Sequence, residues 1–435
     1  MVKKLVVLFM VSLFFGGALV SALPARPIHI LSLRDRAEVV NTWLEVRLET
    51  ILPEVMKREG IDMWLVICRE YNEDPVFLTL VPADYFSARR LTMLVFYLHD
   101  DHLEKLAVSR YPIGKLYRSV WQPTKMDQWS CLAQVIKERN PQRIGINVGP
   151  DFAFGDGLSA YLKEKLEKAL GPELASRLVS AEKVAVGWLE KRLPEEIEVY
   201  HHLVHIAHEI IAEAFSAQVI TPGVTTATDV VWWMREKIKE LKLDTWFQPS
   251  VSIQRAPSSS YQGLVIHQGD LLHCDIGITY LRLNSDTQEH AYVLRPGEID
   301  APEGLKKALA VGNRLQDILI AEFQAGRTGN EVLRLALQKA KAEGIEASIY
   351  SHPLGFHGHA AGPTIGLWDH QEGVPGPGDY PLYLDTCYSI ELNVQVPMPE
   401  WGGKKVRIAL EQDAVFTGEG VTFLDGRQTS FHLIR

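Results

Sequence analysis

Cysteine is scarce in this chain. Its 435 residues include only four cysteines, Cys68, Cys131, Cys274 and Cys387, and they are far apart. No Cys-x-x-Cys or cysteine–histidine pattern occurs, so the sequence predicts neither a disulfide framework nor a structural zinc site. The spacing leaves the pairing of the four open. Cys274 precedes Asp275 in a predicted strand, so it should point to the opposite face as a packed thiol.

An excess of positive charge is also absent. The chain has 45 lysines and arginines against 54 aspartates and glutamates, a formal net charge of −9. General nucleic-acid binders need a basic surface, so we expect no nucleic-acid partner. The apolar share of 46% is average for a globular protein, which excludes wholesale disorder. The length of 435 residues is enough for two or three domains.

The extreme N-terminus has the features of a targeting segment. Lys3 and Lys4 precede an apolar run over residues 5–20, which ends in a Val-Ser-Ala cleavage signal at Ala22. The run is short for a transmembrane helix. We predict a signal peptide over residues 1–22, no stable membrane anchor after its cleavage, and export to the periplasm or the outside of the cell. The alternative is an uncleaved membrane anchor.

Residues 23–185 alternate between apolar runs and helical patterns. Strands are predicted at 63–67, 91–97, 103–109 and 143–147, and helices within 30–60 and near 127–138 and 157–170. This alternation predicts an α/β domain of about 150 residues. We find no catalytic constellation in it.

Residues 186–435 follow a different pattern. Helices are predicted from Leu193 to about 217 and at 227–242, 302–323 and 328–343, with strands between and after them, among them 248–254. The order of two helices and then strands occurs twice. This indicates an internal duplication with the strands gathered in one curved sheet, an α+β fold.

Three histidines share one face of the first of these helices. His201, His205 and His208 have helical spacing, so a metal site must be considered. No carboxylate occurs in register with them. We therefore interpret this face as ordinary helix surface or interface.

A predicted hairpin carries two aspartates inside apolar strands. If it turns about Tyr280 and Leu281, Asp275 and Asp286 lie directly opposite each other, with Cβ atoms about 5 Å apart. Carboxylates that close repel, so one takes up a proton or a cation lies between them. The alternative is two solvated aspartates on an edge strand, although aspartate is poor material for an apolar strand.

A second predicted hairpin repeats this arrangement. If its turn centres on Trp401, Glu391 and Glu411 lie opposite each other, again from apolar strands. One such coincidence is weak evidence. Two of them, one in each half of a duplicated domain, indicate a common site.

A glycine-rich loop between the two hairpins contains His352, His357 and His359. Its small residues allow the backbone to approach a ligand closely. Four carboxylates and one imidazole suit two divalent cations of the manganese, cobalt or zinc kind, with a shared water between them. The residues alone do not select one of the three histidines.

The order of these residues resembles a known family. Asp275, ten further residues, Asp286, a histidine- and glycine-rich loop, Glu391 and then Glu411 resemble the pita-bread metallopeptidases. These include methionine aminopeptidase, Xaa-Pro aminopeptidase (aminopeptidase P), prolidase and creatinase. The match covers roughly residues 190–435. The preceding α/β domain resembles the creatinase/prolidase N-terminal domain in size and position, which favours the prolidase and aminopeptidase P branch and implies a homodimer.

The resemblance also implies roles for individual residues. The implied metal ligands are Asp275, Asp286, His359, Glu391 and Glu411. Asp286 and Glu411 would bridge the two metals, and Glu391 would also act as the general base on the shared water. His357 is the alternative imidazole ligand. His352 or His357 would be the catalytic histidine that contacts the substrate.

Two departures from the family pattern leave the substrate class open. The family has a histidine well before the first aspartate, but residues 256–261 contain none, and Ser260 stands nearest. The family also has a histidine just before an acidic residue after the loop, where this chain has Trp368 before Asp369.

The predicted function is that of an exported metallopeptidase. We expect two divalent metal ions, with manganese favoured and cobalt or zinc as alternatives, and a peptide substrate cut at an N-terminal Xaa-Pro bond. The alternatives are an Xaa-Pro dipeptidase (prolidase), a creatinase-like C–N hydrolase that works without metal, and a non-catalytic peptide-binding module on the same fold.

Overall fold

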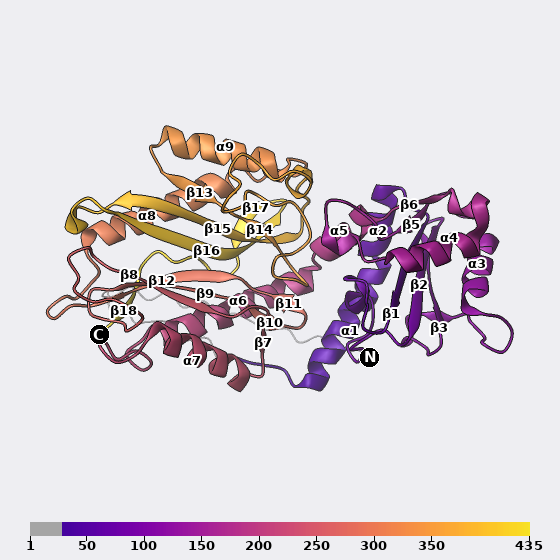
Figure 1. The fold of residues 1–435 in the computed structure, drawn as a ribbon, viewed down its shortest axis with the longest axis horizontal. Helices are drawn as coiled ribbons and strands as arrows, with labels where there is room; N and C mark the ends of the chain where they lie inside the picture. Colours follow the sequence, from indigo (N-terminus) through magenta and orange to yellow (C-terminus); the bar gives the residue numbers. More distant parts are fainter. Residues whose placement is uncertain (1–27) are drawn as a thin grey trace, which may run out of the picture. The chain divides into compact units, whose positions relative to one another are not determined.

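The computed structural model describes residues 28–435, and the element labels follow Figure 1. The predicted signal peptide, residues 1–22, lies outside the described residues. Among the helices that are described, none is long and apolar enough to cross a membrane.

The N-terminal half is built on a six-stranded sheet. Its strands are β1 (Met63–Arg69), β2 (Leu91–His99), β3 (His102–Ser109), β4 (Arg118–Ser119), β5 (Ile144–Ile146) and β6 (Leu178–Ser180). Their order in space is β4-β3-β2-β1-β5-β6. β1 pairs antiparallel with β2 and parallel with β5, so the sheet is mixed. The predicted strands are confirmed as β1, β2, β3 and β5.

Five helices accompany this sheet. They are α1 (Leu33–Glu49), α2 (Ile51–Glu59), α3 (Gln128–Arg139), α4 (Ala160–Ala175) and α5 (Glu182–Glu190). Ser32 caps α1 by accepting the Asp35 N–H, which satisfies a backbone donor that has no partner within the helix. Apolar residues of α3 and α4 pack with Met63, Leu65 and Ile67 of β1 in one core.

The C-terminal half contains four long helices and a nine-stranded sheet. The helices are α6 (Pro194–Ala214), α7 (Ala227–Glu240), α8 (Glu303–Ile320) and α9 (Gly329–Ala342). The main strands are β8 (Ser250–Gln254), β9 (Leu271–Ile276), β12 (Thr287–Val293), β13 (Ala347–Ile349), β15 (Thr386–Pro397) and β16 (Lys405–Thr417). Shorter strands join them at β14 (His352–Leu354), β17 (Gly420–Phe423) and β18 (His432–Ile434).

Short elements complete the chain. β7 (Asp244–Thr245), β10 (Ile278–Tyr280) and β11 (Leu283–Asn284) form a three-stranded sheet in the order β11-β10-β7. Single 3₁₀ turns occur at η1 (Phe77–Thr79), η2 (Ala153–Gly155), η3 (Pro377–Asp379) and η4 (Pro399–Trp401).

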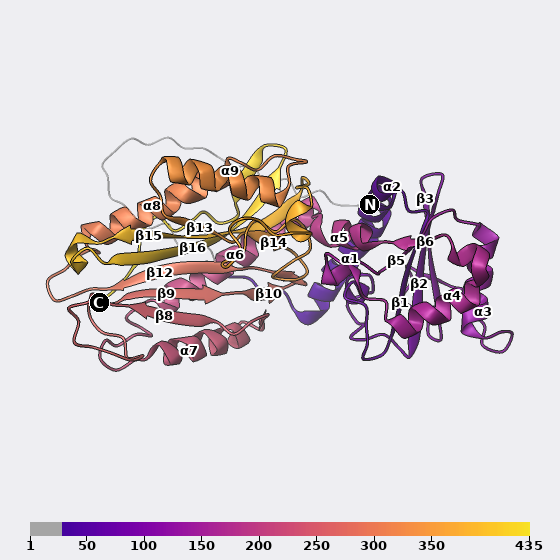
Figure 2. The same ribbon diagram turned by 45° about the horizontal axis from the view of Figure 1, so that its top comes forward.

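The predicted duplication is visible in the strand order β13-β15-β16-β12-β9-β8. From a seam between β12 and β16, each half continues outward through its own strands. α6 and α7 pack against β12 and β8, and α8 and α9 pack against β15, β16 and β13. Figures 1 and 2 show α8 and α9 on the half that holds β13, β15 and β16, and α7 beside β8.

The packing of α8 decides which face of the sheet stays open. Ile390, Leu392 and Leu410 are buried in one core with apolar residues of α8 and α9. Successive residues of a strand point to opposite faces, so the neighbouring Glu391 and Glu411 project from the other face. The candidate site lies on that face.

The predicted boundary between residues 185 and 186 falls inside α5, which packs against α2 of the N-terminal half. Residues 31–435 form one compact unit. The chain then enters α6 through Pro194 at its first turn, where the Glu196 carboxylate accepts the Leu193 N–H at 2.8 Å.

Candidate active site

The hairpin that carries the two aspartates has a different register from the predicted one. Asp275 of β9 lies opposite Gln288 of β12, so it does not face Asp286. Asp286 directly precedes β12, two positions before Gln288, and its carboxylate reaches the same side of the sheet. Single carboxylate oxygens of Asp275, Asp286 and Glu411 therefore lie within 4.8 Å of one another.

The turn of this hairpin accounts for the difference. Leu281 and Arg282 form the two-residue loop between β10 and β11, and both have positive φ, 52° and 66°. Two such residues match the twist of a hairpin, although glycine or asparagine is the usual choice. The Arg282 guanidinium donates to the carbonyls of Val81 and Pro82 at 3.0 and 3.2 Å. These long-range hydrogen bonds hold the turn in place, although its own residues are not the usual turn formers.

The second hairpin has the predicted register. Glu391 of β15 lies directly opposite Glu411 of β16. Glu411 in turn lies opposite Gln288 on its other side. A row of side chains therefore crosses four neighbouring strands in the order Asp275, Gln288, Glu411, Glu391.

His352 is the histidine closest to these carboxylates. It begins β14, and its Nε2 atom lies 3.6 Å from Asp286 Oδ2, 3.6 Å from Glu411 Oε1 and 4.0 Å from Glu391 Oε2. This Nε2 atom is buried and has no hydrogen-bond partner, while Nδ1 lies 3.1 Å from the Pro353 carbonyl. The imidazole thus presents one free nitrogen to three carboxylates.

His359 lies at the exposed edge of the same cluster. It groups with Asp286 and His352, and its ring meets that of His352 at 4.7 Å and nearly at a right angle. Burial, and then the neighbouring His352, lower the pKa of His359 to about 4. The Trp246 ring packs against His359 at 5.1 Å, and a Cβ atom at Gly358 would lie 2.1 Å from that ring.

His357 lies outside all three candidate metal groups among the described residues. Its ring stacks on Phe154 of the N-terminal half at 4.5 Å, and burial and then Arg192 lower its pKa to about 4. The neighbouring Phe356 lies between the guanidinium groups of Arg47 and Arg192, at 4.8 and 4.7 Å. These contacts connect the loop between His352 and His359 to the N-terminal half.

The negative charges of Asp275, Asp286, Glu391 and Glu411 are not balanced by ion pairs with lysine or arginine within the described residues. Burial, and then the charge of Glu411, raise the pKa of Asp275 to about 8 and hold the pKa values of Asp286 and Glu391 well above their usual range. Within the described residues, the ion pairs of these acids all involve His352, and none involves lysine or arginine.

The donor set fits divalent cations. One buried oxygen each of Asp275 and Asp286 has no hydrogen-bond partner, and neither has Nε2 of His352. Carboxylate oxygens and one imidazole nitrogen are ligands that manganese, cobalt and zinc accept. These residues form three overlapping groups. The first consists of Asp275, Asp286 and Glu411. The second consists of His352, Glu391 and Glu411, and the third of Asp286, His352 and His359.

Neutral donors that were not among the predicted site residues hold the acids. Gln288 donates to Glu391 at 3.0 Å and to Glu411 at 2.6 Å, and the Ser389 hydroxyl also donates to Glu411. Gln288 and Ser389 could have been predicted, because each lies two positions from a predicted ligand and residues two apart in a strand share a face. Asp413, two positions after Glu411, accepts the Asp286 N–H at 3.2 Å.

Ser260 and Trp368 stand at the two positions that depart from the family pattern. Ser260 lines a separate surface pocket with Asp270 and Arg295. Trp368 is 77% exposed, and exposed Asp369 pairs with the adjacent His370 at 3.0 Å.

The histidines of α6 also lie outside the candidate metal groups found within residues 28–435. His205 and His208 both approach one carboxylate oxygen of Asp425, at 3.2 and 2.9 Å, and His201 contacts the Leu424 carbonyl. The carboxylate that the sequence pattern lacked in register with these histidines is thus supplied by Asp425 of a distant segment.

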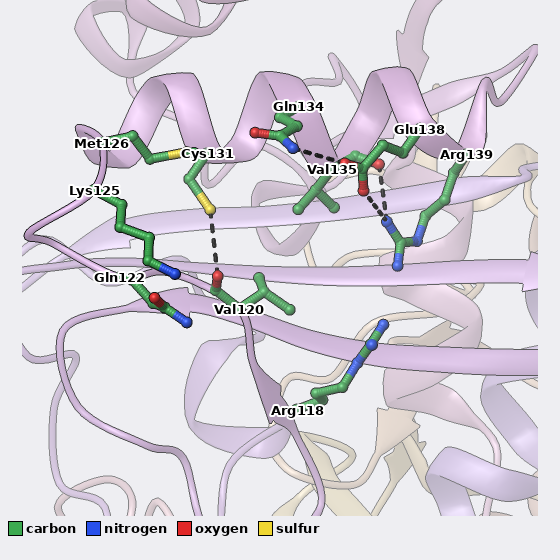
Figure 3. A pocket seen from close by; sticks show the side chains of 10 residues that line it. All are labelled: Arg118, Val120, Gln122, Lys125, Met126, Cys131, Gln134, Val135, Glu138 and Arg139. Carbon is green, nitrogen blue, oxygen red and sulfur yellow. Dashed lines mark hydrogen bonds and ion pairs between the residues drawn. The ribbon is translucent and has the colours of Figure 1, made fainter.

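A further surface pocket lies beside α3 in the N-terminal half. Figure 3 shows that Arg118, Lys125 and Arg139 line it together with Glu138. Arg118 and Arg139 each pair with Glu104 at 2.8 Å, and Arg139 also lies 3.9 Å from Glu138, so two carboxylates balance these two arginines. The four cysteines are buried and unpaired, Cys131 of this pocket among them.

Comparisons with known proteins agree with this geometry. Residues 201–417 match the model of metallopeptidase family M24. No curated protein matches the sequence. The X-Pro aminopeptidase from Thermotoga maritima MSB8 is a similar solved structure, with a TM-score of 0.61 and 17% identity over 87% of this chain and 99% of that one. The Xaa-Pro dipeptidase from Bacillus anthracis has a TM-score of 0.57 and 18% identity over 90% and 100%.

A third similar structure carries no peptidase name. It is the N-terminal domain of FACT complex subunit SPT16 from Cicer arietinum (chickpea), with a TM-score of 0.56 and 12% identity over 91% of this chain and 99% of that one. At such identities these likenesses show the shared fold. Because the family model covers the segment that holds all four carboxylates and the three histidines, the chain belongs to the pita-bread metallopeptidases of family M24.

Proposed function

We propose that this protein is an exported, dinuclear-metal-dependent exopeptidase that hydrolyses the Xaa-Pro bond at the N-terminus of peptides. The observation that carries the proposal is the convergence of Asp275, Asp286, Glu391 and Glu411 with the free Nε2 atom of His352. Buried carboxylates with raised pKa values and no lysine or arginine partner are stabilised by bound cations.

Two neighbouring metal positions are compatible with the donor set. Asp275, Asp286 and Glu411 would hold one ion, and His352, Glu391 and Glu411 the other, so Glu411 would be shared. Asp286 would be the second shared carboxylate, because it also groups with His352. When bound, such ions lower the pKa of a water molecule and polarise the carbonyl of the scissile bond. Manganese is the proposed metal, with cobalt and zinc as alternatives.

The distances favour an exchange of the histidine roles implied by the resemblance. His352 Nε2 is buried and lies near carboxylates of both halves, which suits an imidazole ligand. His359 is exposed at the edge of the cluster and neutral at physiological pH, which suits contact with the substrate. We therefore propose His352 as the ligand and His359 as the catalytic histidine. His357 supports the loop through its stacking on Phe154.

Glu391 is the proposed general base. Its Oε1 atom accepts a hydrogen bond from Gln288, so Oε2 is the atom left to take a proton from the attacking water. Among the described side chains near the carboxylates, the hydroxyl of Ser389 is held by Glu411 and is unavailable as a nucleophile. Hydrolysis by direct attack of water, without a covalent intermediate, follows from this arrangement.

Substrates longer than dipeptides are favoured. A dipeptidase must offset the desolvation of the substrate's C-terminal carboxylate, usually with a basic partner near the site. Arg255 cannot serve, because it forms two hydrogen bonds of 2.9 Å with Asp270 and donates to the carbonyls of Gly263 and Val265. Exposed Arg407 of β16 is close enough to Glu391 for their charges to interact, and it is the arginine that could take this role.

A panel of four compounds tests the proposal. Manganese-loaded protein is incubated with Ala-Pro-Ala, Ala-Pro, Ala-Ala-Ala and creatine, with and without a chelator. We expect release of alanine from Ala-Pro-Ala, slower cleavage of Ala-Pro, and loss of both with chelator. Faster cleavage of Ala-Pro would identify a dipeptidase. Cleavage of Ala-Ala-Ala alone would contradict the proposed specificity for Xaa-Pro bonds. Chelator-resistant turnover of creatine would indicate the creatinase-like alternative.

A non-catalytic peptide-binding module is the second candidate. The likeness to a FACT subunit domain and the absence of a histidine from residues 256–261 favour it. The complete set of carboxylates favours an enzyme. Binding of Ala-Pro-Ala without turnover by metal-loaded protein would select the module.

Export and a homodimer complete the proposal. The basic start and the small-residue cleavage signal at Ala22 support a mature chain that begins at Leu23. N-terminal sequencing of the native protein tests this, and retention of Met1 would contradict it. Light scattering of the purified protein tests the proposed homodimer. A monomer mass at micromolar concentration would contradict the homodimer.

A further inference from the structure

We propose that Gln288 is a positioning residue, oriented by His273, which holds Glu391 and Glu411 at the spacing that the metal pair requires. This inference rests on the proposed function, because it concerns the same site. Gln288 fills the place in the row of acids between Asp275 and Glu411. Figure 1 shows the four strands of that row, β9, β12, β16 and β15, side by side.

One amide nitrogen serves both glutamates. Gln288 Nε2 lies 3.0 Å from Glu391 Oε1 and 2.6 Å from Glu411 Oε2. An amide nitrogen carries two hydrogens, so it satisfies one oxygen of each acid at once. The side chain is 5% exposed, so bulk water does not replace these bonds. The two glutamates are thereby tied to a strand of the other half of the sheet.

His273 fixes which end of the amide faces the acids. Its Nε2 atom lies 2.9 Å from Gln288 Oε1 and donates to it. A flipped amide would present its oxygen to two carboxylates, which is repulsive, and its nitrogen to His273, which could accept it only in the other tautomer. The His273 ring packs against the ring of His290 at 4.9 Å, and the ring nitrogens of His290 contact the Leu272 carbonyl and the Ala409 N–H.

A neutral donor suits this position better than a charged one. Lysine or arginine would also hold two glutamates, but its positive charge would compete with the cations. Gln288 and the Ser389 hydroxyl restrain the acids and leave their negative charge for the metals. Partners of metal ligands typically change metal affinity about 10–100-fold when they are removed.

The test is a calorimetric titration of the metal-free protein with Mn²⁺, together with the kcat and KM of the loaded enzyme. Gln288→Met keeps the length of the side chain and removes both donors. We expect Mn²⁺ affinity to fall at least about tenfold. We also expect kcat for Ala-Pro-Ala to fall at saturating Mn²⁺ while KM changes little. Gln316→Met is the matched control, because Gln316 is a fully buried glutamine on α8 outside the cluster.

A second pair of variants leaves Gln288 in place. His273→Phe removes the donor to the amide oxygen, and His273→Gln keeps an N–H that can reach it. We expect His273→Phe to weaken Mn²⁺ binding and His273→Gln to restore most of it. A purely structural role would lower the unfolding temperature of both variants without this order of affinities. The pair decides the question even if Gln288→Met fails to fold.

Two results would overturn the inference. One is Mn²⁺ affinity of Gln288→Met within twofold of the parent, and the other is equal affinities of His273→Phe and His273→Gln. Failure of the proposed function looks different, because the parent protein would then bind no Mn²⁺ or cleave no peptide. A parent that binds Mn²⁺ without turnover still tests Gln288 through the titration.

Discussion

Gln288 of β12 and Glu411 of β16 are the paired residues that join the two halves of the nine-stranded sheet. Each half contributes carboxylates on the same face, Asp275 and Asp286 from one and Glu391 and Glu411 from the other. The seam therefore sets the distance between the two sets of acids. A change at this pair acts on all the proposed metal ligands together.

Replacement of His352 should change the metal content, whereas replacement of His359 should change kcat. His352→Ala removes the nitrogen nearest to three carboxylates, so we expect the metal content to fall from two ions per chain to about one or none. His359→Ala should keep both ions and lose about 10²–10³-fold in kcat, the usual contribution of one hydrogen-bond donor to a developing oxyanion, because a neutral imidazole donates a hydrogen bond without titrating. Elemental analysis with steady-state kinetics distinguishes them. The opposite pattern would return His359 to the role of ligand.

The shared carboxylates should be indispensable for metal binding. Asp286→Ala or Glu411→Ala should remove metal and activity together, because each is a proposed bridge. Without metal, these variants should be no less stable than the metal-free parent, because repulsion among the remaining acids eases. Thermal unfolding after exhaustive dialysis against chelator measures this. A large loss of stability in the metal-free variants would contradict it.

Metal removal should make stability depend on pH. The folded protein holds the pKa of Asp275 at about 8, far above its usual value, so between about pH 4 and 8 the folded state binds a proton that the unfolded state has lost. The stability of the metal-free protein should therefore fall as the pH rises through this range. Bound cations favour the ionised acids, so Mn²⁺ should reverse the trend. Unfolding temperatures at pH 5, 6.5 and 8, with and without Mn²⁺, provide the measurement.

A methyl group at Gly358 should disturb catalysis without removing the metals. The added Cβ atom would lie 2.1 Å from the Trp246 ring, which packs against His359, so one of the two must move. We expect Gly358→Ala to cost about 1–3 kcal/mol of stability. We also expect kcat/KM to fall and the metal content to stay unchanged. Gly418→Ala is the control, because nothing lies within 4 Å of its added Cβ. Equal activity of the two variants would contradict this account.

Several features followed from the sequence alone. The alternation of Ile390, Glu391 and Leu392 predicted both the strand and the face of the acid, because the period of a strand is two residues. Asp275 and Asp286 likewise reach the same side of the sheet, although the predicted register of their hairpin was wrong. The duplication and the α/β N-terminal half were likewise visible in the pattern of helices and strands.

Only the tertiary structure decided the finer geometry. The turn at Leu281 and Arg282 lacks glycine or asparagine, and its register depends on bonds from Arg282 to carbonyls about 200 residues earlier in the chain. The spacing of His352, His357 and His359 in the chain could not select one of three identical side chains. The structure separates two of them, because His352 faces the acids while His357 packs against Phe154. Local periodicity determines which face a residue occupies, and contacts between distant segments determine which residues on that face meet.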